Sequence, residues 1–340
     1  MLGLGVCCTG IISPECFDSF GINDDAILAR ANSATFFAPS GKSLSLSTER
    51  VQAYVVDRAS LDQLITAKAQ AQGVNYFFSS RVIDIRVEKD CTQVEVLSQK
   101  SRERLVARAV VVAAGFNPKL TSLLGLGRIT NFAVGAQMEV ETQGVERIEV
   151  YFSQEVAPGF FAWLVPISEN RALTGVISPS YASLYLKNLL ASSFCQGKII
   201  EGETRMRQKV IPLGTLSRTY RDRVLVVGDS AGQVKPTTGG GIYFGHLGAE
   251  MASEVLSQSL KVDDLSAARL SQYERRWKAK MGKEISIGCW ARKLYGRLSD
   301  HQIEHIFRVI ESHGIAESLL RSSDFSFDWH SKLIMAALKR

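Results

Sequence analysis

The sequence predicts a mixed α/β (α+β) fold, with a core of buried strands and helices, an antiparallel sheet and C-terminal helices. The core is indicated by the apolar run Val224–Val227, which is typical of a strand buried on both faces and precedes a helical segment from Ile242. Short β-branched and aromatic runs in the middle of the chain indicate the antiparallel sheet. The C-terminal helices are indicated by apolar residues at i, i+3, i+4 and i+7, which mark one core-facing side: Ile303, Ile306, Phe307 and Ile310.

The first part of the chain alternates between helical and strand patterns. Leu61–Gln72 has apolar residues at helical spacing and ends at Gly73, a residue type that commonly follows a helix. The strand-like runs that follow are Tyr76–Phe78, Val82–Glu88, Gln93–Leu97 and Arg108–Ala113. The last of these runs leads into Gly115.

The middle of the chain favours an antiparallel sheet over further βαβ units, because turn residues separate its strand-like runs at short intervals. These strands are expected at Phe132–Val140, Arg147–Phe152, Phe160–Pro166 and Arg171–Val176. A helix over Ala182–Phe194 and a strand near Val210 then return the chain to the core, whose last helix is expected over Ile242–Leu260.

These patterns divide the chain into three parts. We predict a discontinuous core of residues 1–30, 51–125 and 205–262. Residues 31–50 and 126–204 form the antiparallel-sheet part, and residues 263–340 form a C-terminal helical region.

The composition is that of an ordinary globular chain, with 46% hydrophobic and 22% charged residues among 340. No apolar run approaches the ~18 residues that a membrane-spanning helix needs, and no signal peptide is visible, so a cytoplasmic location is predicted. The six cysteines show neither a pairing framework nor zinc spacing, and the five histidines form no ligand cluster. We therefore expect reduced thiols and no metal.

Positive charge gathers near the C-terminus. From Lys261 to the end, 15 Lys and Arg face 10 Asp and Glu, a surplus of five that carries most of the net charge of +6. Between Arg275 and Arg297 only Glu284 interrupts a series of eight cations. A solvated helix face explains this pattern; the alternatives are contact with an anionic membrane surface or with an acidic electron carrier, and no nucleic-acid partner is expected.

The loop between the buried strand and the helix at Ile242 contains Gly228, Asp229 and a glycine triplet. Glycines at the start of a helix let the backbone approach a ligand closely and leave N–H groups directed at an anionic or electron-rich group. An Asp at a strand end can accept hydrogen bonds from ribityl or ribose hydroxyls. The alternative is a glycine-rich turn in which Asp229 is a local cap.

The longer string GDSAGQVKPTTGGGIYFG resembles the second flavin-binding motif of the geranylgeranyl reductase family, flavoproteins similar in fold to p-hydroxybenzoate hydroxylase. Val55–Val74 resembles the family's D-R-x-x-F-D segment, with Leu61 where Phe is usual. Pro158–Pro166 resembles its Y-x-W-x-F-P element, with Phe161 for Tyr and Val165 for Phe. Cys8-Thr9-Gly10 resembles its C-x-G element, so the resemblance covers about residues 7 to 290.

The resemblance implies a Rossmann-like FAD-binding core of the p-hydroxybenzoate hydroxylase or glutathione reductase type, with the antiparallel sheet on the substrate side. FAD is the expected cofactor. The residues that the resemblance places against it are Arg58, Gly115, Gly228, Asp229, Gly239, Gly240 and Gly241. For Arg58, the alternative is a surface ion pair with Asp57 or Asp62.

Two further elements concern the substrate side. Phe161 and Trp163 alternate along one predicted strand and therefore point to the same face, which in the family lines the isoprenoid pocket; ordinary core packing is the alternative. Cys8 is the one candidate catalytic residue, since the resemblance places it near the reactive face of the flavin, and an inert buried thiol is its alternative. No residue identifies itself as a proton donor.

A flavoprotein of this type should begin with a strand, a G-x-G-x-x-G turn and a helix. This chain opens MLGLGVCCTG, and Gly3-x-Gly5 has neither a strand before it nor a third glycine in register. We therefore expect the chain to lack the N-terminal βαβ unit, through a late start codon, a partial chain or a natural truncation.

The function implied is that of an FAD-dependent reductase that saturates C=C bonds of a polyprenyl chain on a lipid or diphosphate by hydride transfer from reduced flavin. The electron donor is left open between NAD(P)H, ferredoxin and a quinol, and membrane association is an alternative to a purely cytoplasmic enzyme. A flavin monooxygenase or halogenase is a second hypothesis, because FAWLVP also resembles the halogenase element F-x-W-x-I-P. A truncated, non-catalytic protein that binds an apolar ligand is the third.

Overall fold

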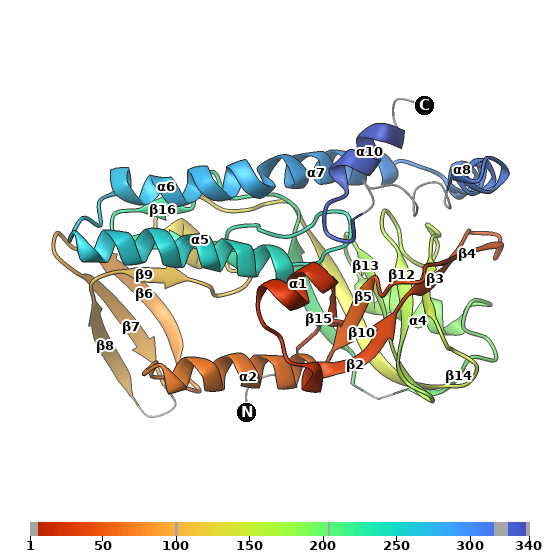
Figure 1. The fold of residues 1–340 in the computed structure, drawn as a ribbon, viewed down its shortest axis with the longest axis horizontal. Helices are drawn as coiled ribbons and strands as arrows, with labels where there is room; N and C mark the ends of the chain where they lie inside the picture. The colour runs from red at the N-terminus through yellow and green to blue at the C-terminus, as the bar shows by residue number, and fades with distance from the viewer. Residues whose placement is uncertain (1–5, 99–100, 203–204, 316–325, 338–340) are drawn as a thin grey trace. The chain divides into compact units, whose positions relative to one another are not determined.

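The fold was analysed in a computed structural model, which describes residues 6–98, 101–202, 205–315 and 326–337 (Figure 1). Two units are distinguished. Unit 1 comprises Met1–Ala67, Ala133–Val210 and Ile287–Arg340, and unit 2 comprises Lys68–Phe132 and Ile211–Ser286. Each unit is described by itself. Gly3 and Gly5, on which the expected absence of a G-x-G-x-x-G turn depends, lie outside the described residues.

The main feature of unit 1 is a sheet with the strand order β14-β10-β13-β12-β11-β3-β4, to which β15 adds beside β10. Every pair along this path is antiparallel except β11 with β3, which is parallel. The strands are β3 (Ser33–Phe37), β4 (Ser43–Ser47), β10 (Phe132–Thr142), β11 (Ile148–Tyr151), β12 (Ala162–Ser168), β13 (Arg171–Ser178), β14 (Ile199–Gly202) and β15 (Arg207–Pro212). Helix α4 (Ala182–Ala191) packs Leu186 and Leu189 into the buried core of this sheet.

A smaller antiparallel sheet in unit 1 joins β1 (Ile11–Ile12), β5 (Ala53–Val56) and β2 (Ile27–Ala31). Ser13 caps α1 (Pro14–Ser19), and a 3₁₀ turn, η1 (Asp24–Ala26), precedes β2. Helix α2 (Arg58–Ala71) begins in this unit. The unit also contains α8 (Asp300–Ser312), which opens with a capping box of Ser299 and Gln302, and α10 (Ser331–Ala337).

Unit 2 is built on the sheet β16-β17-β9, in which β17 pairs with β9 in parallel. The strands are β16 (Tyr220–Arg221), β17 (Val224–Val226) and β9 (Val110–Val112), and a 3₁₀ turn, η2 (Gly228–Ser230), follows β17. Helices α5 (Ile242–Lys261) and α6 (Ala267–Trp277) pack against each other, and a π-helical turn, η3 (Lys278–Gly282), joins α6 to α7 (Lys283–Tyr295). A second, antiparallel sheet contains β6 (Arg81–Val87), β7 (Thr92–Leu97) and β8 (Arg102–Ala107), and α3 (Pro118–Leu123) follows β9.

The mixed α/β fold class is confirmed, and most elements lie where the patterns place them. β17 is fully buried, α5 begins at Ile242 as expected, and the middle of the chain forms the sheet of unit 1. The division into three domains stays a prediction. No helix in the described part of the chain is both long and apolar enough to span a bilayer.

Two expectations about elements are wrong, and some strands were not predicted. Tyr76–Phe78 forms no strand: its three aromatic side chains are exposed, and the rings of Tyr76 and Phe78 stack on each other. β8 (Arg102–Ala107) lies in a charged segment that the patterns did not indicate. On the side of α8 that was expected to face the core, Ile303 is buried and Phe307 and Ile310 are half-buried, but Ile306 is exposed.

Candidate functional site

The segment Gly228–Gly241, here called the glycine loop, connects β17 to α5. Gly228 has φ +62°, a conformation that only glycine adopts readily, and the chain turns there directly after the buried strand. At Gly232, which has φ +77°, an added Cβ would lie 2.0 Å from the carbonyl oxygen of Gly214. The loop therefore packs backbone against backbone, and glycine is required for that packing.

Two buried polar side chains hold the start of the loop. The backbone N–H of Gly228 donates to Oε1 of Gln233 (2.8 Å), and Nε2 of Gln233 donates to the hydroxyl of Tyr273 (2.7 Å). That hydroxyl donates in turn to the carbonyl oxygen of Val226 (2.8 Å), so the network closes on the end of β17. Gln233 and Tyr273 are fully buried, and burial raises the pKa of the Tyr273 phenol, which keeps it neutral.

Gly248 of α5 gives this network its space. A Cβ added there would lie 2.1 Å from Oε1 of Gln233. Gln233, Gly248 and Tyr273 were not predicted from the sequence, since the network joins residues 40 positions apart and no local pattern marks it.

The end of the loop lies at the start of α5. The backbone N–H of Lys235 donates to the carbonyl oxygen of Gly240 (3.0 Å), and the N–H of Gly239 donates to that of Lys235 (2.8 Å). Gly241 is the N-cap of α5 and provides no side-chain cap. A Cβ added to Gly241 would lie 2.9 Å from Oδ1 of Asp229, which places the carboxylate beside the helix N-terminus. Asp229 and the triplet are half-buried, so solvent reaches this polar part of the loop.

Gly115, which follows β9, lies close to the start of the glycine loop, which follows β17. β9 and β17 run in parallel with Val112 opposite Val226, so their carboxyl ends lie at the same edge. The hydroxyl of Ser230 donates to the carbonyl oxygen of Gly115. Ligands of open parallel sheets bind at such an edge. The structure therefore brings together Gly115, Gly228, Asp229 and the glycine triplet, all within unit 2.

Arg58 and Cys8 lie together in unit 1. Nη2 of Arg58 donates to Oδ1 of Asp62 (2.7 Å), and Nη1 lies 3.7 Å from Sγ of Cys8. Burial lowers the pKa of Arg58, but Cys8 and Asp62 more than offset this effect, so the net pKa is raised. Nε of Arg58 is buried and has no hydrogen-bond partner among the described residues. Asp57 caps α2 instead, through the N–H groups of residues 59 and 60.

The cysteine beside Cys8 has a different environment. Sγ of Cys7 lies 3.5 Å from the carbonyl oxygen of Arg207. Burial, assisted by Cys8, raises the pKa of the Cys7 thiol to about 11, so this thiol is protonated near neutral pH. Cys7 is therefore a poor nucleophile.

Phe161 and Trp163 share a face, as their alternation predicts. Their ring centroids lie 5.9 Å apart, and Phe152 lies 6.2 Å from Phe161. Tyr295 and Phe307 contact Phe152 edge-on, at 6.1 and 5.8 Å. We call these five half-buried residues of unit 1 the aromatic face. Nε1 of Trp163 and the hydroxyl of Tyr295 are buried without a hydrogen-bond partner among the described residues, which is unusual unless a ligand or water completes them.

The position of Trp163 depends on a glycine in the next strand. Trp163 pairs with Gly175 between β12 and β13, and a Cβ added to Gly175 would lie 2.3 Å from the indole ring. The indole therefore lies directly on the backbone of β13.

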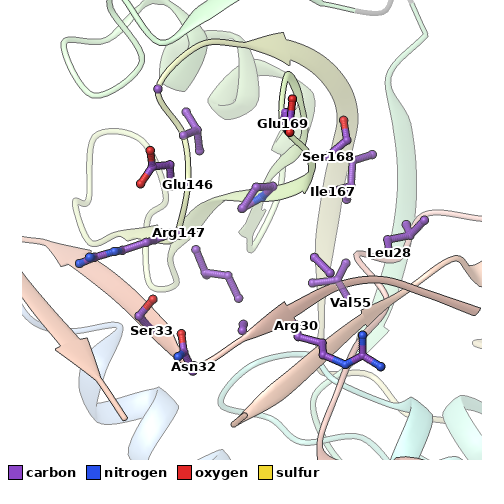
Figure 2. Close-up of a pocket in the computed structure, with 16 residues that line it drawn as sticks. Leu28, Arg30, Asn32, Ser33, Val55, Glu146, Arg147, Ile167, Ser168 and Glu169 are labelled. Carbon is purple, nitrogen blue, oxygen red and sulfur yellow. The ribbon is translucent and has the colours of Figure 1, made fainter. Parts of the chain in front are cut away.

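A separate cavity of about 520 Å³ lies in unit 1, beside β2 and the turns that follow β10 and β12 (Figure 2). Its lining includes the charged residues Arg30, Glu146, Arg147 and Glu169, and Figure 2 shows that their side chains do not converge on one point. None of the residues predicted for the site lines this cavity. Within the described ranges no group of three or more His, Cys, Asp or Glu side chains is placed to hold a metal ion.

Comparisons with known proteins agree with the predicted resemblance. The family model described as "Lycopene cyclase protein" matches residues 34–309. A digeranylgeranylglycerophospholipid reductase of Methanocaldococcus jannaschii is 29% identical and is covered over 78% of its length by 86% of this chain. Digeranylgeranylglycerophospholipid reductase 2 of Methanothermobacter thermautotrophicus is 28% identical, with 94% of this chain covering 86% of that protein.

Solved structures agree on the fold. A geranylgeranyl bacteriochlorophyll reductase-like protein of Thermoplasma acidophilum has a TM-score of 0.85 at 18% identity, over 100% of this chain and 87% of that one. The flavin-dependent halogenase CmlS has a TM-score of 0.67 at 14% identity, over 100% of this chain and 71% of that one. The Rossmann-like fold class predicted from the sequence is confirmed by these neighbours.

Proposed function

Since the chain belongs to the lycopene cyclase protein family, we propose that it is an FAD-dependent oxidoreductase acting on CH–CH groups. Its reaction is the saturation of C=C bonds in a polyprenyl chain carried by a lipid or diphosphate. The observation that carries this proposal is the glycine loop, where the Asp229 carboxylate lies beside the N-terminus of α5. Similarity to two curated reductases of isoprenoid lipids over most of the chain supports the choice of substrate.

The residues of the glycine loop fit a flavin. Asp229 is half-buried, and we propose that its carboxylate accepts hydrogen bonds from ribityl hydroxyls. The N–H of Gly239 is already bonded to Lys235, so the N–H groups at the start of α5 are the candidates to stabilise negative charge on the flavin's pyrimidine end, and the helix dipole adds to that effect. A bound flavin supplies the hydride, and the protein supplies orientation and electrostatics.

The cofactor roles of Arg58 and Gly115 are proposals of the same kind. Arg58 keeps a buried, unpaired Nε although its terminal nitrogens are engaged, so one donor is left for a ligand. Gly115 has φ +66° and nothing within 4 Å of its Cβ position, which leaves room for close approach to the backbone. Cys8 stays a candidate near the reactive face.

The aromatic face fits the substrate side. Aromatic side chains offer large apolar area and need few polar partners, which suits a long polyprenyl chain. Trp163 and Tyr295 add two unpaired donors for a polar group at one end of that chain. Phe161 stands where the family has Tyr, so this face has one hydroxyl fewer. NAD(P)H or ferredoxin is proposed as the electron donor.

The direct test uses the purified full chain with added FAD. We expect the visible absorption of bound flavin, its bleaching by anaerobic dithionite, and its reappearance when a polyprenyl phospholipid is added. Mass spectrometry of that lipid should show a gain of two hydrogens for each bond saturated. Failure to bind FAD would contradict the flavin assignment and leave an apolar-ligand-binding protein. Reoxidation by oxygen alone, with oxygenation or halogenation of a substrate, would favour the monooxygenase or halogenase hypothesis.

A further inference from the structure

Helix α7 has two opposite faces of different character. Its inward face contributes Arg292, whose guanidinium lies 5.1 Å from the centre of the Phe160 ring, and Tyr295, which belongs to the aromatic face. Its outward face carries Trp290, Lys293 and Leu294. One further turn follows the last helical residue, Tyr295, because the N–H of Arg297 donates to the carbonyl oxygen of Leu294 (3.0 Å). Residues spaced i, i+3, i+4 and i+7 share one side of a helix.

The outward face combines exposed apolar area with positive charge. Trp290 is 49% exposed and Leu294 is 44% exposed, and their spacing of i and i+4 makes them an exposed apolar pair on one side of the helix. Lys293 and Arg297 are exposed beside them. No acidic residue occurs between Glu284 and Asp300, so nothing on this stretch neutralises the two cations.

We propose that Trp290, Lys293, Leu294 and Arg297, here called the docking face, bind the surface of an anionic lipid bilayer. Trp prefers the boundary between headgroups and acyl chains, and Leu enters that boundary beside it. Lys and Arg extend their charged ends to anionic headgroups while their stems cover apolar surface. Trp and Arg are also common at protein interfaces, and we choose the bilayer as the occupant because the proposed substrate is a lipid.

The reason for this protein to bind a membrane rests on the proposed function, because polyprenyl lipids reside in bilayers. The opposite sides of α7 then have complementary tasks. Tyr295 packs in the aromatic face, and the docking face lies on the other side of the same helix. Binding of the docking face would hold the aromatic face about one helix diameter, roughly 10 Å, from the bilayer surface.

The test is co-sedimentation of the full chain with vesicles of phosphatidylglycerol and phosphatidylcholine, compared with phosphatidylcholine alone. We expect retention on the anionic vesicles at low salt and weaker retention at high salt, because salt screens the cations. Lys293→Gln with Arg297→Gln should weaken partitioning by roughly 25-fold, since each cation near an anionic surface contributes about fivefold. Trp290→Gln with Leu294→Gln should weaken it by a similar factor.

The matched control is Leu184→Gln with Lys187→Gln on α4, an exposed Leu and Lys pair at i, i+3 elsewhere in unit 1. This pair should leave vesicle binding unchanged, and thermal melting of all three variants should match the parent chain. No retention of the parent chain on anionic vesicles would overturn the proposal. So would loss of binding in the charge variant with full binding in the Trp290/Leu294 variant, which would show that the two apolar side chains do not enter the bilayer. Vesicle binding is measured without flavin turnover, so its failure is distinguishable from failure of the reductase assignment.

Discussion

The glycine loop of unit 2 and the aromatic face of unit 1, the two proposed binding surfaces, are built in opposite ways. The loop is fixed by backbone contacts, such as that of Gly232 with Gly214, and by a closed network of buried hydrogen bonds. The aromatic face is fixed by ring packing and leaves the polar atoms of Trp163 and Tyr295 without partners. A surface made of backbone tolerates few substitutions, whereas a surface made of side chains changes its ligand preference by exchanging side chains.

The largest expected effect is that of Gly232→Ala. The added Cβ meets a carbonyl oxygen at 2.0 Å, and backbone on both sides prevents a small adjustment. We expect the free energy of unfolding of unit 2 to fall by about 3 kcal/mol or more. Chemical denaturation followed by circular dichroism measures it.

Gly125→Ala is the matched control, because Gly125 also has positive φ in unit 2 but nothing lies within 4 Å of its Cβ position. Strain alone should cost about 1–2 kcal/mol there. Equal losses in the two variants would show that the loop has no special backbone packing.

Asp229→Ala is expected to act on the flavin rather than on folding. A hydrogen bond to a charged group contributes about 1.5–3 kcal/mol, so flavin affinity should fall by on the order of tenfold to a hundredfold. Titration of the apoprotein with FAD, followed by flavin fluorescence, measures this change. The exposed carboxylate of Asp90 supplies the control Asp90→Asn, which should bind flavin normally. Unchanged affinity in Asp229→Ala would return this residue to the role of a local cap.

Tyr273→Phe tests the support behind the loop. Loss of the hydroxyl leaves Nε2 of Gln233 and the carbonyl oxygen of Val226 buried without their partner. We expect a loss of about 1–3 kcal/mol in unfolding free energy, together with weaker flavin binding. A fully stable variant with normal flavin binding would show that the network does not position the loop. Tyr181→Phe, at a largely exposed tyrosine, should have no effect.

Phe161→Tyr should have the smallest effect. The ring is half-buried, and the added hydroxyl reaches a face that already has unpaired donors. We expect unfolding free energy within about 0.5 kcal/mol of the parent and unchanged flavin affinity. The ratio of kcat/KM between polyprenyl substrates of different length should change by less than about tenfold. A loss of flavin from this variant would contradict the separation of cofactor and substrate surfaces.

Local patterns predicted the parts of the fold that depend on neighbours in sequence. The apolar run Val224–Val227 marks a strand because each of its side chains has to be buried, and Ile242 begins α5 where the glycines end. The same reasoning placed a strand at Tyr76–Phe78, where the side chains are aromatic but exposed by up to 60% at Phe77. A strand also needs a partner strand, and strand propensity cannot supply one.

The sequence by itself determined the strand, the glycine loop and the helix that follows it, together with the pairing of Phe161 and Trp163 on one face. These features depend on backbone preference and periodicity over a few residues. Only the tertiary structure decided that Tyr273 holds Gln233, that Gly248 makes room for it, and that Trp163 lies on Gly175. Such contacts join residues far apart in the chain, and they form only where close packing of the folded backbone brings them within hydrogen-bonding or van der Waals distance.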